Sequence, residues 1–281
     1  MPVYEQAYRR YEARQPLRRL RFWPITREAL RSLLARKAFL LLLLSAWVPA
    51  LGFLVYLYVV TQFPDVGRQL PSDGRVFGRY LATQQFFLLL ASVFAGAGLI
   101  ASDLSSGGIL VYLSRPLTRR DYVLGKLGVL LAVQLSVTLV PGLLLYAAAL
   151  ALAPGHFARV ELAWIGPAIV AQSLLMASSF SLAALAVSSL VKSARAAGLL
   201  FFGGLMVLGI VARILAELSR RAEASLLSLP ALVGTVGNAM FGLAERGPRL
   251  HWGLALLALA LLGASCLLIL RARVRAVEIV R

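Results

Sequence analysis

The sequence has 281 residues, of which 60% are hydrophobic and only 15% are charged, and its formal net charge is +17. A soluble protein of this size cannot bury that much apolar sequence when the sequence runs in long uninterrupted stretches, so soluble enzymes and binding modules are excluded. A strongly basic chain is compatible with nucleic-acid binding, but the basic residues here gather at the ends of apolar stretches, which argues against that function.

Residues 1–37 are too charged to cross a membrane and lack the layout of a signal peptide. Leu30, Leu33 and Leu34 form an apolar stripe, and Thr26 is a candidate helix N-cap. We expect this region to be cytoplasmic and to contain an amphipathic helix that lies on the inner leaflet and bends into the first span. The alternative is a basic anchor with no further role.

Six apolar runs follow, each about as long as the ~20 residues that a spanning helix needs. The sequence therefore predicts an all-α, polytopic membrane protein, in which residues 38–281 form one six-span transmembrane domain. The predicted spans cover approximately residues 38–60, 81–101, 127–153, 164–190, 198–216 and 252–270.

Most of the 29 basic residues fall on one side of these spans, in residues 9–37, 115–126, 192–195 and 271–281. Cytoplasmic loops carry an excess of lysine and arginine, so both termini and the loop at 102–126 are predicted to be cytoplasmic, in the inner (plasma) membrane. The expected partners of these arginines are anionic membrane lipids, not nucleic acid.

The loop at 102–126 has the pattern of a short capped helix. Pro116 blocks a helix arriving from upstream. Thr118 and Asp121 have the spacing of a capping box. Gly125 is expected to close the last turn in a left-handed conformation, and Lys126 suits the negative end of the helix dipole. A loop that only reverses the chain does not need a capped helix, so we expect this one to bind a partner.

Several spans contain polar or small residues. The inner half of the second span is rich in small residues, including Ser92 and Gly96, which allow close helix packing. Polar side chains there and in the third and fourth spans indicate either the lining of a passage or hydrogen bonds between helices. The candidate passage residues are Gln84, Gln85, Gln134, Ser136, Thr138, Gln172 and Ser173.

The outer segment at 217–250 is apolar in its middle but is interrupted by Pro230, Gly234 and Gly237. It is too short to span, so a re-entrant or interfacial helical pair is expected there. The fifth span before it carries Arg213 near its outer end.

No span has a charged residue at its centre, although ion-coupled carriers usually do. His156, His251 and Cys266 are isolated, and the chain has no phosphate-binding loop motif. We therefore expect no catalytic or metal site and no cofactor in this chain, and we expect the energy for transport to come from another subunit.

The layout and the loop resemble those of type-2 ABC transporter permeases. The family pattern in this loop is an acidic residue, a glycine turn, a Leu-Ser run, then Pro, Ser/Thr, Arg and Gly-Lys. Asp103 stands where Glu is commoner, and Ile109 stands where Thr often follows the glycine. The matching residues are Asp103, Gly107, Gly108, Leu113, Ser114, Pro116, Thr118, Arg119, Gly125 and Lys126.

The resemblance implies a permease that pairs with a second permease chain, most simply as a homodimer, and with two ATP-binding cassette subunits that hold the ATP and Mg²⁺. The loop helix would then couple to the ATPase. Export of a hydrophobic or amphipathic molecule is the first hypothesis. A non-transporting membrane scaffold or regulatory subunit is the second, and an ion-coupled carrier or channel is the third. The expected ATPase-contact residues are Arg115, Pro116, Leu117, Thr118, Arg119, Arg120, Asp121 and Tyr122.

Overall fold

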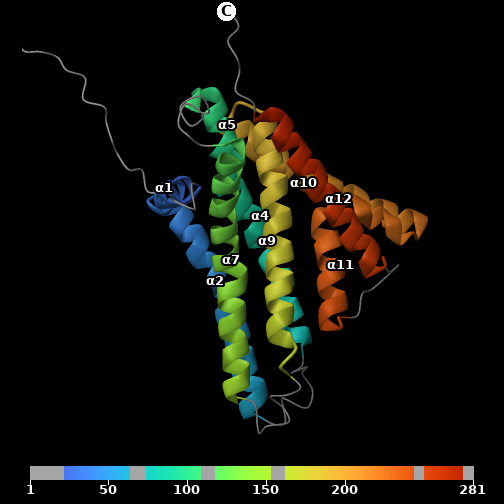
Figure 1. Ribbon diagram of the computed structural model, residues 1–281. Helices are drawn as coiled ribbons and strands as arrows, with labels where there is room; N and C mark the ends of the chain where they lie inside the picture. Colours follow the sequence, from blue (N-terminus) through green and yellow to red (C-terminus); the bar gives the residue numbers. More distant parts are fainter. Residues whose placement is uncertain (1–21, 64–73, 109–117, 153–161, 244–249, 275–281) are drawn as a thin grey trace, which may run out of the picture.

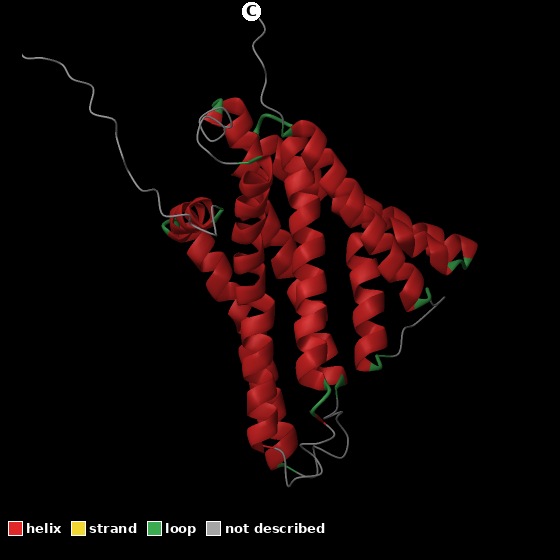
Figure 2. Cartoon of the chain, in the orientation of Figure 1, coloured by secondary structure: helices red, strands yellow, loops and turns green. Residues whose placement is uncertain are grey.

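The computed structural model describes residues 22–63, 74–108, 118–152, 162–243 and 250–274. Within these residues the fold is entirely helical (Figure 2). Six helical segments are long and apolar enough to cross a membrane, which confirms the predicted fold class. They are α2 (Lys37–Gln62), the combined segment Arg75–Ser105, α7 (Arg119–Leu152), α9 (Ile165–Leu190), α10 (Ala194–Ser219) and α12 (Trp252–Arg273).

The second span and α9 form the interior of the bundle together with α7. In the most apolar stretch of the second span and of α9, 56% of the residues are buried, against 17% in α2 and 11% in α10. Figure 1 shows α7 and α9 side by side, with α10 and α12 tilted away from them. Large side chains such as Tyr80, Leu130 and Phe180 fill the interior, whereas α2 and α10 present apolar faces to the surroundings.

Glycines set the distances between the inner helices. A Cβ atom added to Gly96 would lie 3.0 Å from the Cβ atom of Ala184 on α9. A Cβ atom on Gly142 of α7 would lie 3.0 Å from Ile169 of α9. The contact at Gly96 confirms that small residues in the second span allow close helix packing, and Gly142 does the same in the third span.

The second span is not a uniform α-helix. It consists of α4 (Arg75–Ala91), a π-helical turn η1 (Ser92–Gly96) and α5 (Ala97–Ser105). At the π turn, the side-chain amide of Gln134 on α7 donates a 2.7 Å hydrogen bond to Ser92 Oγ, and the hydroxyl of Ser181 on α9 donates to Gln134 Oε1 at 3.2 Å. A buried polar network thus joins the second, third and fourth spans where the α-helical ladder changes.

Two short helices lie between the fifth and sixth spans, in the segment where a re-entrant or interfacial pair on the outer side is expected. They are a 3-10 helix, η2 (Ala222–Leu227), and a short α-helix, α11 (Leu229–Phe241). Phe241 lies close to Gly78 at the start of α4, whereas Gly234 lies near Gln85, two helical turns further along α4. The N-terminal end of α11 is therefore the deeper end. Insertion of this pair into a membrane stays a prediction.

The N-terminal helix α1 (Trp23–Leu34) starts earlier than the sequence predicts. Its N-cap is Phe22, with Pro24 in the first turn, so the prediction that Thr26 caps the helix is wrong. Thr26 lies inside α1 and is buried because it faces α7. The position of α1 at a membrane surface stays a prediction.

Candidate functional site

The first candidate site is the junction between the end of α5 and the start of α7, on the side of the bundle that the basic residues predict to be cytoplasmic. Asp103 on α5 receives two contacts from α7, from residues one helical turn apart. The hydroxyl of Tyr122 donates a 2.7 Å hydrogen bond to Asp103 Oδ2, and Lys126 Nζ lies 2.8 Å from the same oxygen. Lys126 Nζ also lies 5.5 Å from the centre of the Tyr122 ring. We call Asp103, Tyr122 and Lys126 the clamp.

The clamp is nearly buried. The Lys126 side chain is 6% exposed and the Asp103 side chain is 17% exposed. Charges at such sites are tolerated when they are paired and hydrogen-bonded. Because the clamp joins α5 to α7, both ends of the connecting loop are held at a fixed separation. Gly107, which has a left-handed φ of +69°, lets the chain turn away after α5.

The start of α7 carries the predicted capping box. The backbone N–H of Thr118 donates to Asp121 Oδ2 at 3.0 Å, and the backbone N–H of Asp121 donates back to Thr118 Oγ1 at 3.2 Å. The Thr118 hydroxyl also donates to Asp121 Oδ2, at 2.8 Å. The helix start is therefore well defined at Arg119.

The predicted end of this helix is wrong. Gly125 does not close a two-turn helix, because α7 continues without a break to Leu152. Among the described glycines only Gly107 and Gly242 have positive φ. Gly125 instead permits a close approach of α1, and Lys126 pairs with Asp103 instead of a helix end. The capped residues and the third span therefore form one continuous helix.

Helix α1 packs directly against this part of α7. The Thr26 hydroxyl donates a 2.9 Å hydrogen bond to the carbonyl of Gly125. A Cβ atom on Gly125 would lie 3.0 Å from Ile25, and one on Gly128 would lie 3.1 Å from the Thr26 hydroxyl. Sequence reasoning missed this contact. The available signal was the pair of glycines one turn apart, Gly125 and Gly128, on the face that α1 covers.

The predicted ATPase-contact residues divide into three groups. Arg115, Pro116 and Leu117 lie outside the described residues. Thr118, Arg119 and Arg120 are exposed, and Asp121 is partly exposed. Tyr122 is 1% exposed and belongs to the clamp, so its assignment as a partner contact is corrected to an anchor within the chain. Gly108 lies beside Asp103 after the turn at Gly107.

Among the candidate passage residues, the buried amides bond to other helices. Gln84 donates to the carbonyl of Ala46 on α2, and Gln172 donates to the carbonyl of Val233 on α11, both at 3.0 Å. Gln134 belongs to the network at the π turn.

The hydroxyl residues do not join helices. Thr138 donates to the backbone carbonyl of Gln134 and Ser136 to that of Val133, both within α7. Ser173 is buried, and its hydroxyl has no hydrogen-bond partner among the described residues. For Gln84, Gln134 and Gln172 the structure favours hydrogen bonds between helices, while the passage role of Gln85 stays a prediction.

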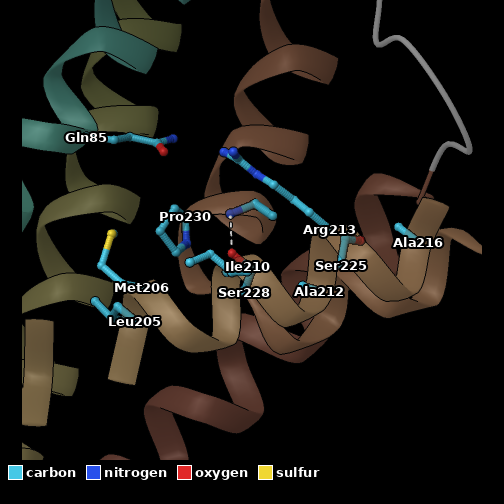
Figure 3. Close-up of a pocket in the computed structure, with 12 residues that line it drawn as sticks. Gln85, Leu205, Met206, Ile210, Ala212, Arg213, Ala216, Ser225, Ser228 and Pro230 are labelled. Atoms are coloured by element: carbon cyan, nitrogen blue, oxygen red, sulfur yellow. Dashed lines mark hydrogen bonds between the residues drawn. The ribbon is translucent and has the colours of Figure 1, made fainter. Parts of the chain in front are cut away.

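Gln85 differs because it lines a cavity between α4, α10, η2 and α11. The cavity measures about 330 Å³, which falls in the range of small-molecule sites. Figure 3 shows the amide of Gln85 and the guanidinium of Arg213 pointing toward one another across it. Sequence analysis placed Arg213 in the fifth span but gave it no role. Among the described residues, no group of three His, Cys, Asp or Glu side chains could hold a metal ion.

A comparison with curated proteins finds no match to the chain. A family model described as an ABC-2 family transporter protein matches residues 78–252. The matched part runs from the second span to the start of α12 and includes the clamp, the capping box and the outer helical pair. Because the match covers more than half of the sequence, the chain belongs to the ABC-2 transporter family and is a multi-pass transmembrane component of an ABC transporter.

Proposed function

We propose that the chain is the permease subunit of an ATP-driven exporter of hydrophobic or amphipathic molecules, coupled to its ATPase through residues 102–126. Association with an ATP-binding cassette subunit follows from the family. The observation that supports coupling at this loop is the clamp, because it ties both ends of the loop to spans that reach the interior of the bundle.

The coupling rests on rigidity. Exposed Arg119 and Arg120 follow a capped helix start, and α7 continues from them through the bundle. Charged groups of this kind guide and orient an interface. A displacement of the ATPase against these residues would move α7 as a unit, and the Asp103–Lys126 pair would carry part of that movement to α5.

The proposed assembly contains two permease chains, as a homodimer, and two ATP-binding cassette subunits. ATP and Mg²⁺ bind to those subunits, and this chain carries no cofactor. The apolar faces of α2 and α10 are available for lipid or for the second permease. Both termini are on the cytoplasmic side of the plasma membrane, where the arginines of α1 meet anionic lipids.

The test is a pull-down of the cognate ATPase by the purified permease, followed by ATP hydrolysis in the complex. Reversing both charges (Arg119→Glu with Arg120→Glu) should leave the helix formed and reduce ATPase capture at least roughly tenfold. Thr118→Pro removes the capping box and should reduce capture as well, because losing an N-cap costs about 1 kcal/mol, enough to fray the first turn but not to unfold the spans.

The matched control is Lys192→Glu with Arg195→Glu, which makes the same charge change on two exposed residues, one in the loop before α10 and one in its first turn, and should preserve capture. Equal loss in the control would refute coupling at residues 102–126. The scaffold hypothesis also predicts capture, so the second readout separates the two. A wild-type complex that binds its ATPase but shows no stimulation of ATP hydrolysis by any lipid or hydrophobic drug would be a scaffold.

A further inference from the structure

The cavity at the outer end of the fifth span has a largely apolar wall. Its α10 wall is apolar except for Arg213, and its α11 wall includes Pro230 and Ala231. Met206 and Ile210 are 37% and 57% exposed, so the cavity opens toward the outer surface of the bundle. An amphiphile in a membrane could therefore reach it from the side, with its hydrocarbon part against α10.

Two of the four polar side chains that line the cavity are already hydrogen-bonded within the chain. Ser225 donates a 2.6 Å hydrogen bond to the Ala222 carbonyl. Ser228 caps α11 by accepting from the N–H of Ala231 at 3.4 Å. Two groups remain. Within the described residues, neither the amide of Gln85 nor the guanidinium of Arg213 has a protein partner.

Arg213 follows the apolar run 196–212 of α10, near the end of the span, and it is exposed. Glu217 lies one turn further along α10, but no ion pair joins it to Arg213 among the described residues, and Figure 3 shows the guanidinium extending toward Gln85. An arginine near the end of a span can keep its charged group at the membrane interface, where acidic head groups lie. The favourable ligand for a guanidinium is a carboxylate or phosphate, which it binds through charge-assisted hydrogen bonds.

We propose that this cavity binds the acidic head group of the cargo, an anionic amphiphile, with Arg213 as its charge partner and Gln85 as a second hydrogen-bond donor. The proposal rests on the proposed transport function and narrows its substrate class. The amphiphile is assigned as cargo and not as a resident lipid because Gln85 belongs to the same continuous span, Arg75–Ser105, that ends at the clamp. A head group at Gln85 therefore contacts the helix that leads to the ATPase.

The binding test uses the purified full chain and two photoactivatable probes with the same alkyl chain, one an alkyl phosphate and the other the neutral alcohol. Labelled peptides are mapped by mass spectrometry. The phosphate should label α10 and α11 about tenfold more than the alcohol, the difference expected for one charge-assisted hydrogen bond. Arg213→Gln should abolish that difference, while Arg213→Lys should retain part of it.

Two further variants guard against indirect effects. Gly209→Leu should block labelling without changing any charge, because a Cβ atom at Gly209 has only Ser228 Oγ near it, at 3.7 Å, and the larger side chain would extend into the cavity. Arg221→Gln removes an exposed arginine outside the cavity and should label like the wild type. Equal labelling by phosphate and alcohol, or unchanged labelling in Arg213→Gln, would overturn the site.

The cargo assignment has a separate readout in the complex with the ATPase. The alkyl phosphate should stimulate ATP hydrolysis in the wild type and should not do so in Arg213→Gln. Selective labelling without stimulation, or full displacement of the probe by phosphatidylglycerol at equal concentration, would make the occupant a resident lipid and overturn the assignment. Stimulation by neutral amphiphiles alone would leave the proposed transport function standing and refute an acidic cargo.

Discussion

The clamp gives a quantitative prediction about stability. Lys126→Met keeps most of the side-chain volume but leaves the Asp103 carboxylate, which is 17% exposed, without its ion-pair partner. Removing one partner of a buried pair typically costs about 3–5 kcal/mol. The expected loss here is nearer the lower limit, about 3 kcal/mol, because the carboxylate keeps some solvent and the 2.7 Å hydrogen bond from Tyr122.

The second half of the prediction concerns the double variant. Asp103→Asn combined with Lys126→Met replaces both charges by neutral groups of similar size, and such replacements are often close to neutral. The carbonyl oxygen of the introduced asparagine side chain can still accept the hydrogen bond from the Tyr122 hydroxyl. The double variant should therefore be more stable than Lys126→Met alone, with an interaction free energy of about 2 kcal/mol between the two positions.

The measurement is reversible unfolding of the purified chain by titration with SDS, followed by circular dichroism, for the wild type, both single variants and the double variant. Leu124→Met is the matched control, since Leu124 is exposed on the same helix and should change the unfolding free energy by less than about 0.5 kcal/mol. If Lys126→Met unfolds at the wild-type SDS concentration, or if the two changes are simply additive, the Asp103–Lys126 pair does not hold α5 to α7 and the coupling proposal loses its support.

Two further predictions concern glycine packing and topology. Gly125→Ala should destabilise the docking of α1, because overpacking against Ile25 costs about 1–3 kcal/mol and exceeds the gain in helix propensity; Gly52→Ala, with nothing within 4 Å of the added Cβ, should instead stabilise by about 0.5–1 kcal/mol in thermal unfolding. Cysteines introduced at Ser105 or Ser193 should be protected from impermeant thiol reagents in intact cells, whereas those at Asp73 or His156 should react, and the reverse pattern would invert the predicted orientation.

The sequence was sufficient for the number and approximate positions of the spans, because the apolar length that crosses a membrane is a local property. It placed the start of the third span near Leu127, although α7 begins at Arg119. The first turns of α7 carry charged residues on the exposed side and the clamp residues on the other side. They therefore show no apolar run, and hydropathy could not identify them as part of the same helix.

The two ends of the helix that the sequence predicts at 118–125 show what local patterns can and cannot predict. The capping box depends on residues three positions apart, so Thr118 and Asp121 could be paired from the sequence. The role of Gly125 depends on α1, which is distant in the sequence and close in the fold. A glycine near a helix end and a glycine at a helix crossing look the same locally.

The polar residues of the spans were ambiguous for a similar reason. A glutamine in an apolar helix can face a passage or a neighbouring helix, and only the arrangement of the helices decides. Gln84 and Gln85 are adjacent in sequence, so they point in different directions around α4. Gln84 meets α2 and is buried, whereas Gln85 faces the cavity. Arg213 lies opposite Gln85 across this cavity, and no spacing in the sequence indicates that arrangement.

The second span connects the cavity to the clamp without an intervening loop, so the proposed coupling between cargo and ATPase does not require a chain of side-chain contacts. The π turn at Ser92–Gly96 interrupts the α-helical ladder between Gln85 and Asp103. Such turns are places where a helix can change its winding. Rotation of α5 relative to α4 would also break the 2.7 Å hydrogen bond that Gln134 donates to Ser92, which ties this turn to α7. Since α7 is also the helix that the clamp fixes to α5, any change of winding at the π turn must move α5 and α7 together or release one of these two contacts.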